Sequence, residues 1–288
     1  MSTDIKKSHF FCTASGPLLC NNESETMRVA SASKPALMLA FLIKYSDLID
    51  GKVYDSAGIG QAICHGPFDP KSSTAWKVLE GTTATYSVDK IVVRNLATLM
   101  GAWSFAEIAA AMMAPDAQSI ENAIRSIGLN KNDFDSPVYN SATNLAMLAL
   151  GGPAGASSAI AKLGFDGAGD IIFNRYMWEP RANIADDNTA TAKSLAHMMQ
   201  FINCYEGKIG TTAKNALNAQ SAPFSKNGIL KSLPPVHAMA RCIEHSGTKI
   251  FYGMIYNVPS SSTLDYAALE TEFKNDESIL VDEAKALL

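Results

Sequence analysis

The chain has 288 residues, of which 47% are hydrophobic and 18% charged, a composition typical of a globular protein. Its formal net charge of −4 argues against nucleic-acid binding, which usually requires a basic surface. The longest apolar run, residues 36–43, is too short to cross a membrane. No apolar signal core follows the first residues, so we expect a cytoplasmic protein unless a signal segment was removed.

Residues 8–15 and 26–30 predict two short strands, and residues 21–24 predict a polar turn between them. The run at residues 36–43 is apolar on every helical face, which indicates a buried helix that ends near residues 50–51. Further helical spacing follows in the middle of the chain, over residues 104–128, 144–163 and 193–205, and Thr189 or Thr191 can cap the last of these helices.

Two strands, 238–244 and 249–257, are separated by Ser246-Gly247 as in a hairpin, and residues 264–288 predict a final helix. Strands near both ends of the chain with helices between them predict an α+β fold with an antiparallel sheet, flanking helices and an inserted all-helical subdomain. We therefore predict one domain, residues 1–288, with a sheet subdomain from residues 1–50 and 206–288 and a helical subdomain from residues 51–205.

The strongest candidate for chemistry is Ser31-Ala32-Ser33-Lys34, which joins a predicted strand to the buried helix. We expect Ser31 at or near the helix N-cap, with Lys34 one turn further on the same face. A serine becomes a good nucleophile when a neutral amine takes its proton, and burial at the positive end of a helix favours the neutral form of lysine. The alternative is a serine that only caps the helix.

Five cysteines stand at irregular spacing, without a CxxC pair or a Cys/His cluster, and this pattern predicts reduced thiols and no metal or cofactor. They are Cys12, Cys20, Cys64, Cys204 and Cys242.

The chain resembles the serine β-lactamase and penicillin-binding protein superfamily, and the class A β-lactamases most. Residues 27–34 and the apolar helix after them look like that family's nucleophile motif, and residues 144–164 read like the family without a gap. Residues 178–183, Trp-Glu-Pro-Arg-Ala-Asn, are similar to its Trp-Glu-Pro-x-x-Asn loop, and residues 187–191 match the segment that re-enters a helix. The resemblance implies a β-lactamase/transpeptidase-like fold.

By this resemblance Glu179 is a general base that acts through a water molecule, and Asn183 helps to hold that water. A glutamate between Trp178 and Pro180 is partly desolvated, which suits a proton acceptor near neutral pH. The alternative is an ordinary loop carboxylate paired with an arginine of the same loop, Arg175 or Arg181.

Two motifs depart from the family. Its Ser-x-Asn motif falls either on residues 138–140, where Tyr139 could supply the hydroxyl beside Asn140, or on residues 115–117. Its Lys-Thr-Gly-Thr motif is matched to His245-Ser246-Gly247-Thr248, with the backbone N–H groups of Ser31 and Thr248 as the oxyanion hole. Histidine is a weaker anchor for a carboxylate than lysine, which favours an amide or ester substrate without that group.

The leading hypothesis is therefore a serine hydrolase or acyltransferase that acts on a small amide, lactam or ester through an acyl-enzyme at Ser31. A serine-dependent glutaminase is the first alternative, because residues 140–144 faintly resemble that family's Asn-Pro-x-x-Asn element. A non-catalytic module that binds a ligand or a partner is the second. The sequence leaves open whether residues 52–103 form a lid or a partner surface, and whether a homodimer covers one face of the sheet.

Overall fold

The computed structural model shows one sheet of five antiparallel strands in the order β2-β1-β7-β6-β5. Both ends of the chain contribute to it, which confirms the predicted α+β class with an antiparallel sheet and flanking helices. The strands are β1 (Lys6–Thr13), β2 (Gly16–Asn21), β5 (Ser225–Leu230), β6 (Val236–His245) and β7 (Thr248–Asn257). The structure describes residues 5–46, 143, 146–147, 150–177, 183–218, 222–232 and 234–288.

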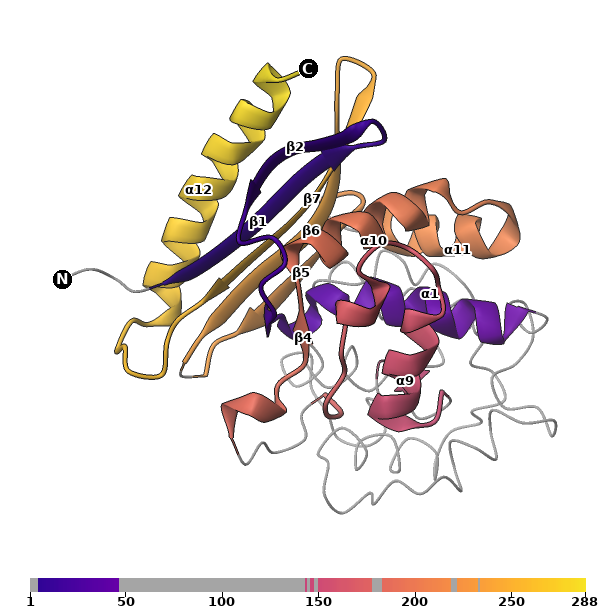
Figure 1. Cartoon of the computed structure of the whole chain (residues 1–288), viewed down its shortest axis with the longest axis horizontal. Helices are drawn as coiled ribbons and strands as arrows, with labels where there is room; N and C mark the ends of the chain where they lie inside the picture. The colour runs from indigo at the N-terminus through magenta and orange to yellow at the C-terminus, as the bar shows by residue number, and fades with distance from the viewer. Residues whose placement is uncertain are drawn as a thin grey trace, which may run out of the picture.

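Helices cover both faces of this sheet (Figure 1). On one face lies α12 (Tyr266–Ala286), whose Leu269 and Phe273 belong to the same buried cluster as Phe11 of β1. The other face is covered by α10 (Ala192–Cys204), with α11 (Gly207–Asn218) and α1 (Lys34–Lys44) beyond it. Phe10 belongs to the core on the α10 side, so adjacent residues of β1 alternate between the two faces as a strand requires.

The contact between α10 and the sheet depends on a glycine in β7. A Cβ atom on Gly253 would lie 2.8 Å from the Cβ of Leu195 and still closer to the carbonyl oxygen of Ala192. Since only glycine has no Cβ, the first turn of α10 can approach the backbone of β7 closely. Thr191 caps this helix by accepting a hydrogen bond from the N–H of Ser194, in agreement with the sequence.

The segment before α1 differs from the prediction. Only Met27–Arg28 forms a strand, β3, and residues 30–33 form a 3-10 helix, η1 (Ala30–Ser33), so that Ser31 is not the N-cap of α1. The helix begins at Lys34 and ends at Lys44, earlier than expected. The remaining elements are α9 (Gly152–Ala161), η5 (Ala168–Asp170), η6 (Ile184–Asp186) and β4 (Thr189–Ala190), which pairs with β3.

The sequence pattern predicts neither β2 nor β5. In β5 the run Ser-Lys-Asn-Gly has weak strand propensity, and its pairing with β6 overrides that local preference. The predicted hairpin is present, because β6 and β7 meet at Ser246 and Gly247, which have φ values of 50° and 79°. The division into a sheet subdomain and an inserted helical subdomain stays a prediction, because most of residues 51–150 lie outside the described ranges.

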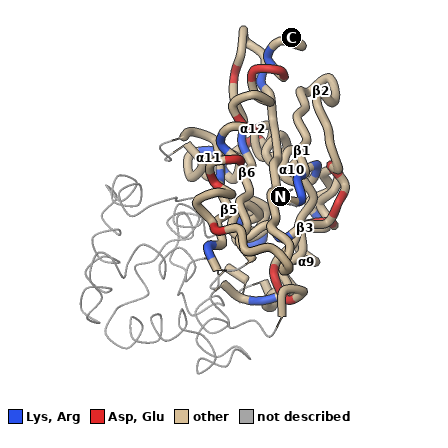
Figure 2. The backbone as a smooth tube through the Cα atoms, turned by 90° about the vertical axis from the view of Figure 1, so that its left-hand side faces the viewer, with Lys and Arg blue, Asp and Glu red and all other residues tan. Residues whose placement is uncertain are grey.

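Charge is distributed without a strong local excess along the described backbone, where basic and acidic positions are interspersed (Figure 2). None of the helices within the described ranges is both long enough and apolar enough to span a bilayer.

A buried histidine links the sheet to α12. His237 of β6 is 4% exposed and lies against the ring of Phe273, with centroids 4.0 Å apart. Its Nδ1 is 3.2 Å from the hydroxyl of Tyr266. Burial lowers the pKa of His237 from 6.5 to about 4.

This burial should make the fold sensitive to mild acid. Between pH 6.5 and pH 4 the unfolded chain binds a proton at His237 that the folded chain excludes, so stability falls as the pH falls. Between pH 7 and pH 5 the wild type should lose about 2 kcal/mol more free energy of unfolding than His237→Gln, as measured by urea denaturation. Equal losses in the two proteins would contradict the assignment.

Candidate active site

Ser31 lies in a strained turn at the entrance to α1. The residue before it, Ala30, has a φ of 47°, a left-handed conformation that costs a non-glycine residue about 1 kcal/mol or more. The backbone N–H of Lys34 donates to the carbonyl oxygen of Ser31, and the hydroxyl of Ser33 lies 3.3 Å from the carbonyl oxygen of Ala30, to which it donates. The turn thus holds the half-buried Ser31 at a fixed position before the helix.

Lys34 is the first residue of α1 and is only 2% exposed. Burial lowers the pKa of its amine well below the usual 10.5, and the positive charge of Lys226 lowers it further. Lys34 follows Ser31 by three residues in consecutive helical turns, so the two side chains share one face. A buried amine that favours its neutral form can accept a proton from a hydroxyl.

Lys226 is the site residue that sequence reasoning missed. It lies on β5, is 3% exposed, and its Nζ donates to the carbonyl oxygen and Oδ1 of Asn227 at 3.0 and 3.1 Å. Because residues two apart in a strand share a face, Lys226 and Gly228 both face the core side that holds η1. The sequence does contain the run Lys226-Asn227-Gly228, but only the structure shows that this run lies in an edge strand.

Gly228 allows the backbone of β5 to touch the turn of Ser31. A Cβ atom at this position would lie 2.9 Å from the backbone nitrogen of Ser31 and 2.6 Å from that of Ala32. It would also overlap the carbonyl oxygen of Val29. Only glycine therefore permits this approach, which fixes the position of Ser31 relative to the edge of the sheet.

The structure does not bring His245, Ser246, Gly247 and Thr248 to this place. They form the tip of the hairpin between β6 and β7, at the far end of both strands. Ala238 pairs with Gly228 beside η1, and His245 lies seven residues further along β6, about 23 Å away. The expectation that this segment borders Ser31 and supplies an oxyanion N–H is therefore wrong, and Lys226-Asn227-Gly228 of the edge strand occupies the expected position.

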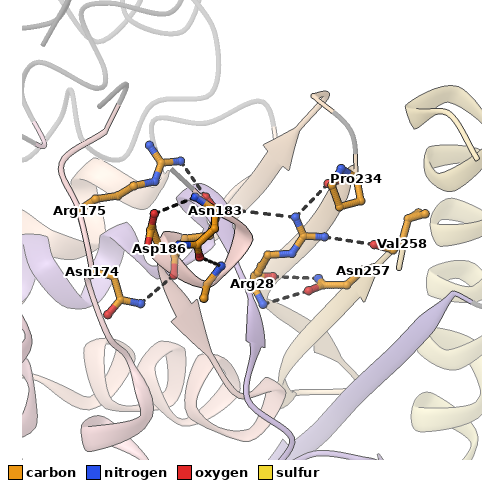
Figure 3. A network of polar contacts seen from close by, with 10 residues as sticks. Arg28, Asn174, Arg175, Asn183, Asp186, Pro234, Asn257 and Val258 are labelled. Atoms are coloured by element: carbon orange, nitrogen blue, oxygen red, sulfur yellow. Dashed lines mark hydrogen bonds and ion pairs between the residues drawn. The ribbon is translucent and has the colours of Figure 1, made fainter. Parts of the chain in front are cut away.

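Buried ion pairs join the two ends of the loop before α10 to each other and to β3 (Figure 3). The carboxylate of Asp187 lies 2.8 Å from Nη2 of Arg175 and 3.5 Å from Nη1 of Arg28. Asn183 is exposed and caps η6, because its Oδ1 accepts a hydrogen bond from the N–H of Ala185 at 2.8 Å. The described contacts of Asn183 are thus structural, and its expected contact with a water molecule stays a prediction.

Several predicted site residues lie outside the described ranges. They are Tyr139 and Asn140, the competing segment 115–117, and Glu179, and their roles stay predictions. Among the residues that the structure does describe, there is no group of three or more histidine, cysteine or acidic side chains that could hold a metal ion.

Solved structures that match this arrangement of elements include several β-lactamases. A β-lactamase from Burkholderia vietnamiensis matches with a TM-score of 0.57 over 99% of this chain and 90% of its own, at 14% identity. The chain has the fold of the class A β-lactamases.

Two further matches support this fold. A class A β-lactamase from Mycobacterium abscessus matches with a TM-score of 0.54 at 14% identity, over 90% of this chain and 87% of its own. A β-lactamase from Sphaerobacter thermophilus matches with a TM-score of 0.55 at 17% identity, over 93% of this chain and 87% of its own. Neither a protein-family model nor a curated protein matches the sequence.

The buried amine in this β-lactamase fold should carry a cost in stability. Because burial lowers the pKa of Lys34, the folded chain binds the proton of this amine more weakly than the unfolded chain does, which costs stability below pH 10.5. Lys34→Met has a similar volume and no ionisable group, so it should raise the free energy of unfolding at pH 7 by at least about 1 kcal/mol.

The wild type should recover this difference as the pH is raised towards 10.5, since the unfolded chain then loses the same proton. Urea denaturation at pH 7, 8 and 9 measures the trend. Lys44→Met, at the exposed last residue of the same helix, is the matched control. A gain for Lys34→Met that does not change with pH would contradict the explanation.

Proposed function

We propose that the protein is a serine hydrolase or acyltransferase that acts on a small amide, lactam or ester through an acyl-enzyme at Ser31. The observation that carries this proposal is the buried Lys34, whose amine has a lowered pKa one turn from Ser31. The strained Ala30 before the serine adds support, since such backbone strain is concentrated at functional sites.

The proposed acylation uses Lys34 as the base. Its neutral Nζ takes the proton of the Ser31 hydroxyl as Oγ attacks the acyl carbon, and the resulting ammonium can return a proton to the leaving group. The backbone N–H of Ser31 is one donor to the oxyanion that forms on the acyl oxygen. By the resemblance, the second donor follows the glycine of the third motif, which makes it the N–H of Ile229 on β5.

Release of the acyl group is assigned to the loop residues. By the resemblance, Glu179 takes a proton from a water molecule that Asn183 helps to hold, and the resulting hydroxide attacks the acyl carbon. The bond between that carbon and Oγ of Ser31 then breaks, and the serine regains a proton. An acceptor other than water in the same position would make the reaction a transfer.

Lys226 favours a substrate with a negative charge. A buried lysine beside the nucleophile can bind a carboxylate on the substrate, and a charge-assisted hydrogen bond of this kind contributes roughly 1.5–3 kcal/mol. The match of the third motif to His245 favoured a substrate without a carboxylate. Because the edge strand β5 carries Lys226 beside the nucleophile, the preference for a carboxylate is the opposite. We therefore favour substrates that carry a carboxylate near the acyl group, such as the lactams of the β-lactamases with a similar fold.

Mass spectrometry of the intact protein tests the nucleophile. Wild type, Ser31→Ala and the neighbouring control Ser33→Ala are incubated with a penicillin, a cephalosporin, an activated ester and a fluorophosphonate. We expect an acyl adduct on the wild type and on Ser33→Ala but not on Ser31→Ala, because only Ser31 precedes the buried amine by one turn.

The absence of any adduct on folded wild-type protein would contradict the proposal. Reversible binding of a small acyl ligand that is equally strong in wild type and Ser31→Ala would instead indicate the non-catalytic binding module. Release of ammonia from glutamine by the wild type alone would assign the acyl-enzyme to the glutaminase reaction.

Lys226→Gln tests the carboxylate preference. For an activated ester that carries a carboxylate, KM should rise about 10-fold or more, while KM for the neutral analogue should change little. His245→Gln removes the residue that the sequence suggested and is the matched control, for which we expect no change with either ester. A rise in KM for His245→Gln and not for Lys226→Gln would overturn the assignment.

A further inference from the structure

Asn257, the last residue of the central strand β7, lies on the face of the sheet that holds the candidate site. Side chains of β7 alternate between the two faces. Tyr256 therefore reaches α12 on the opposite face, where its hydroxyl donates to Oδ2 of Asp276 at 2.6 Å. Gly253, four residues before Asn257, faces α10. Asn257 shares the face of Gly253, and it is buried, with 7% exposure.

The side-chain amide of Asn257 binds both backbone groups of Arg28 in β3 (Figure 3). The N–H of Arg28 donates to Oδ1 at 3.0 Å, and Nδ2 donates to the carbonyl oxygen of Arg28 at 2.9 Å. The N–H of the next residue, Val29, points to the other side and donates to the carbonyl oxygen of Asn188 at 3.0 Å, directly before β4. A side-chain amide carries a donor and an acceptor, as a backbone peptide does. Asn257 therefore takes the place of a neighbouring strand on the side of β3 away from β4.

The side chain of Arg28 adds to the same connection. Its guanidinium donates to the carbonyl oxygens of Pro234 at 2.9 Å and Val258 at 3.2 Å. Val258 directly follows Asn257, so the backbone and the side chain of Arg28 both bind the end of β7. Because β3 has only two residues and belongs to a separate two-stranded sheet with β4, these contacts provide much of its attachment to the main sheet.

The strained turn of the nucleophile begins directly after this attachment. Ser31 follows Arg28 by three residues, and Ala30 between them has the left-handed φ of 47°. Such a conformation persists only where the surrounding structure holds the chain in place. After Ala30, the turn meets the backbone of β5 at Gly228, and before it Asn257 holds Arg28. The turn is thus fixed between the central strand and an edge strand.

We propose that Asn257 is a positioning residue for Ser31, which keeps the strained turn in place beside Lys34 by holding the backbone of Arg28 to β7. This inference rests on the proposed acyl-enzyme at Ser31. Asn257 takes no direct part in the reaction, since its Oδ1 and Nδ2 both bind Arg28. Formation of the acyl-enzyme should depend on Asn257, whereas binding of the substrate carboxylate, which is assigned to Lys226, should not.

The kinetics of acylation test this role. In Asn257→Ala, acylation by the ester that carries a carboxylate should slow by about 10-fold to 100-fold, because a small displacement of the nucleophile greatly lowers the rate. The ester concentration at half-maximal acylation rate should change by less than about threefold, because Lys226 lies on β5. Asn257→Asp keeps an acceptor for the N–H of Arg28 but loses the donor, so it should slow acylation too. Intact mass of quenched samples follows the adduct over time.

The matched control is Tyr256→Phe. It removes one hydrogen bond of the adjacent residue in the same strand, on the opposite face, so acylation should match the wild type. An unchanged acylation rate in folded Asn257→Ala would overturn the proposal. Equal slowing in Tyr256→Phe, or a change in ester binding as large as the change in rate, would indicate a general effect on the fold and would overturn it too.

Hydrogen exchange gives a readout that needs no activity. In Asn257→Ala the amides of Arg28 and Ala32 should exchange at least about 10-fold faster than in the wild type. The N–H of Arg28 loses its acceptor, and that of Ala32 donates within the same turn to the carbonyl oxygen of Val29 at 3.3 Å. Amides of α12 should not change. Exchange of Arg28 and Ala32 that equals the wild type would overturn the positioning role.

The two proposals fail in different ways. If the wild type forms no acyl-enzyme with any probe, the proposed function fails, and the exchange result still decides whether Asn257 holds the turn. If the wild type forms the acyl-enzyme and Asn257→Ala forms it at the same rate, the proposed function stands and the role of Asn257 fails.

Discussion

The contact between the turn of Ser31 and the backbone of β5 is the constraint on which the rest of the candidate site depends. It exists because Gly228 has no Cβ, and it brings the buried face of β5 to the beginning of α1. Lys226 and Lys34 then share one interior region, where burial lowers the pKa of Lys34 and the positive charge of Lys226 lowers it further. The close backbone contact that Gly228 allows therefore comes first. The electrostatic effect of Lys226 on Lys34, on which the proposed chemistry relies, follows from that contact.

Short-range patterns in the sequence predicted the elements whose structure depends on a few adjacent residues. The apolar run after Lys34 predicted a buried helix, and Ser246-Gly247 predicted the hairpin, which lies away from Ser31, since each depends on a few adjacent residues. Ser31 lies near the N-cap of α1, as expected, but not at it, because the strained turn at Ala30 adds a 3-10 helix before α1, and no residue type there predicts that turn.

The features that the sequence did not predict depend on contacts between residues that are far apart in the chain. Ser-Gly-Thr at 246–248 matches the letters of the family's third motif, but the position of that motif depends on which strand forms the edge of the sheet beside the nucleophile. That strand, β5, is polar and short, and only its register with β6 identifies it. The contacts of Arg28 could not be predicted from the sequence either, because its partners Pro234 and Val258 are 206 and 230 residues away in the chain.

The two close approaches at Gly228 and Gly253 have a consequence for how this chain can change over evolutionary time. At both positions backbone meets backbone, with η1 against β5 and α10 against β7, on the same face of the sheet. A frame of this kind does not depend on the identity of most side chains around it, which agrees with a fold retained at 12–17% identity to solved β-lactamases. Sequence drift can therefore replace much of the core, while any side chain at these two glycines would meet backbone atoms of the neighbouring element.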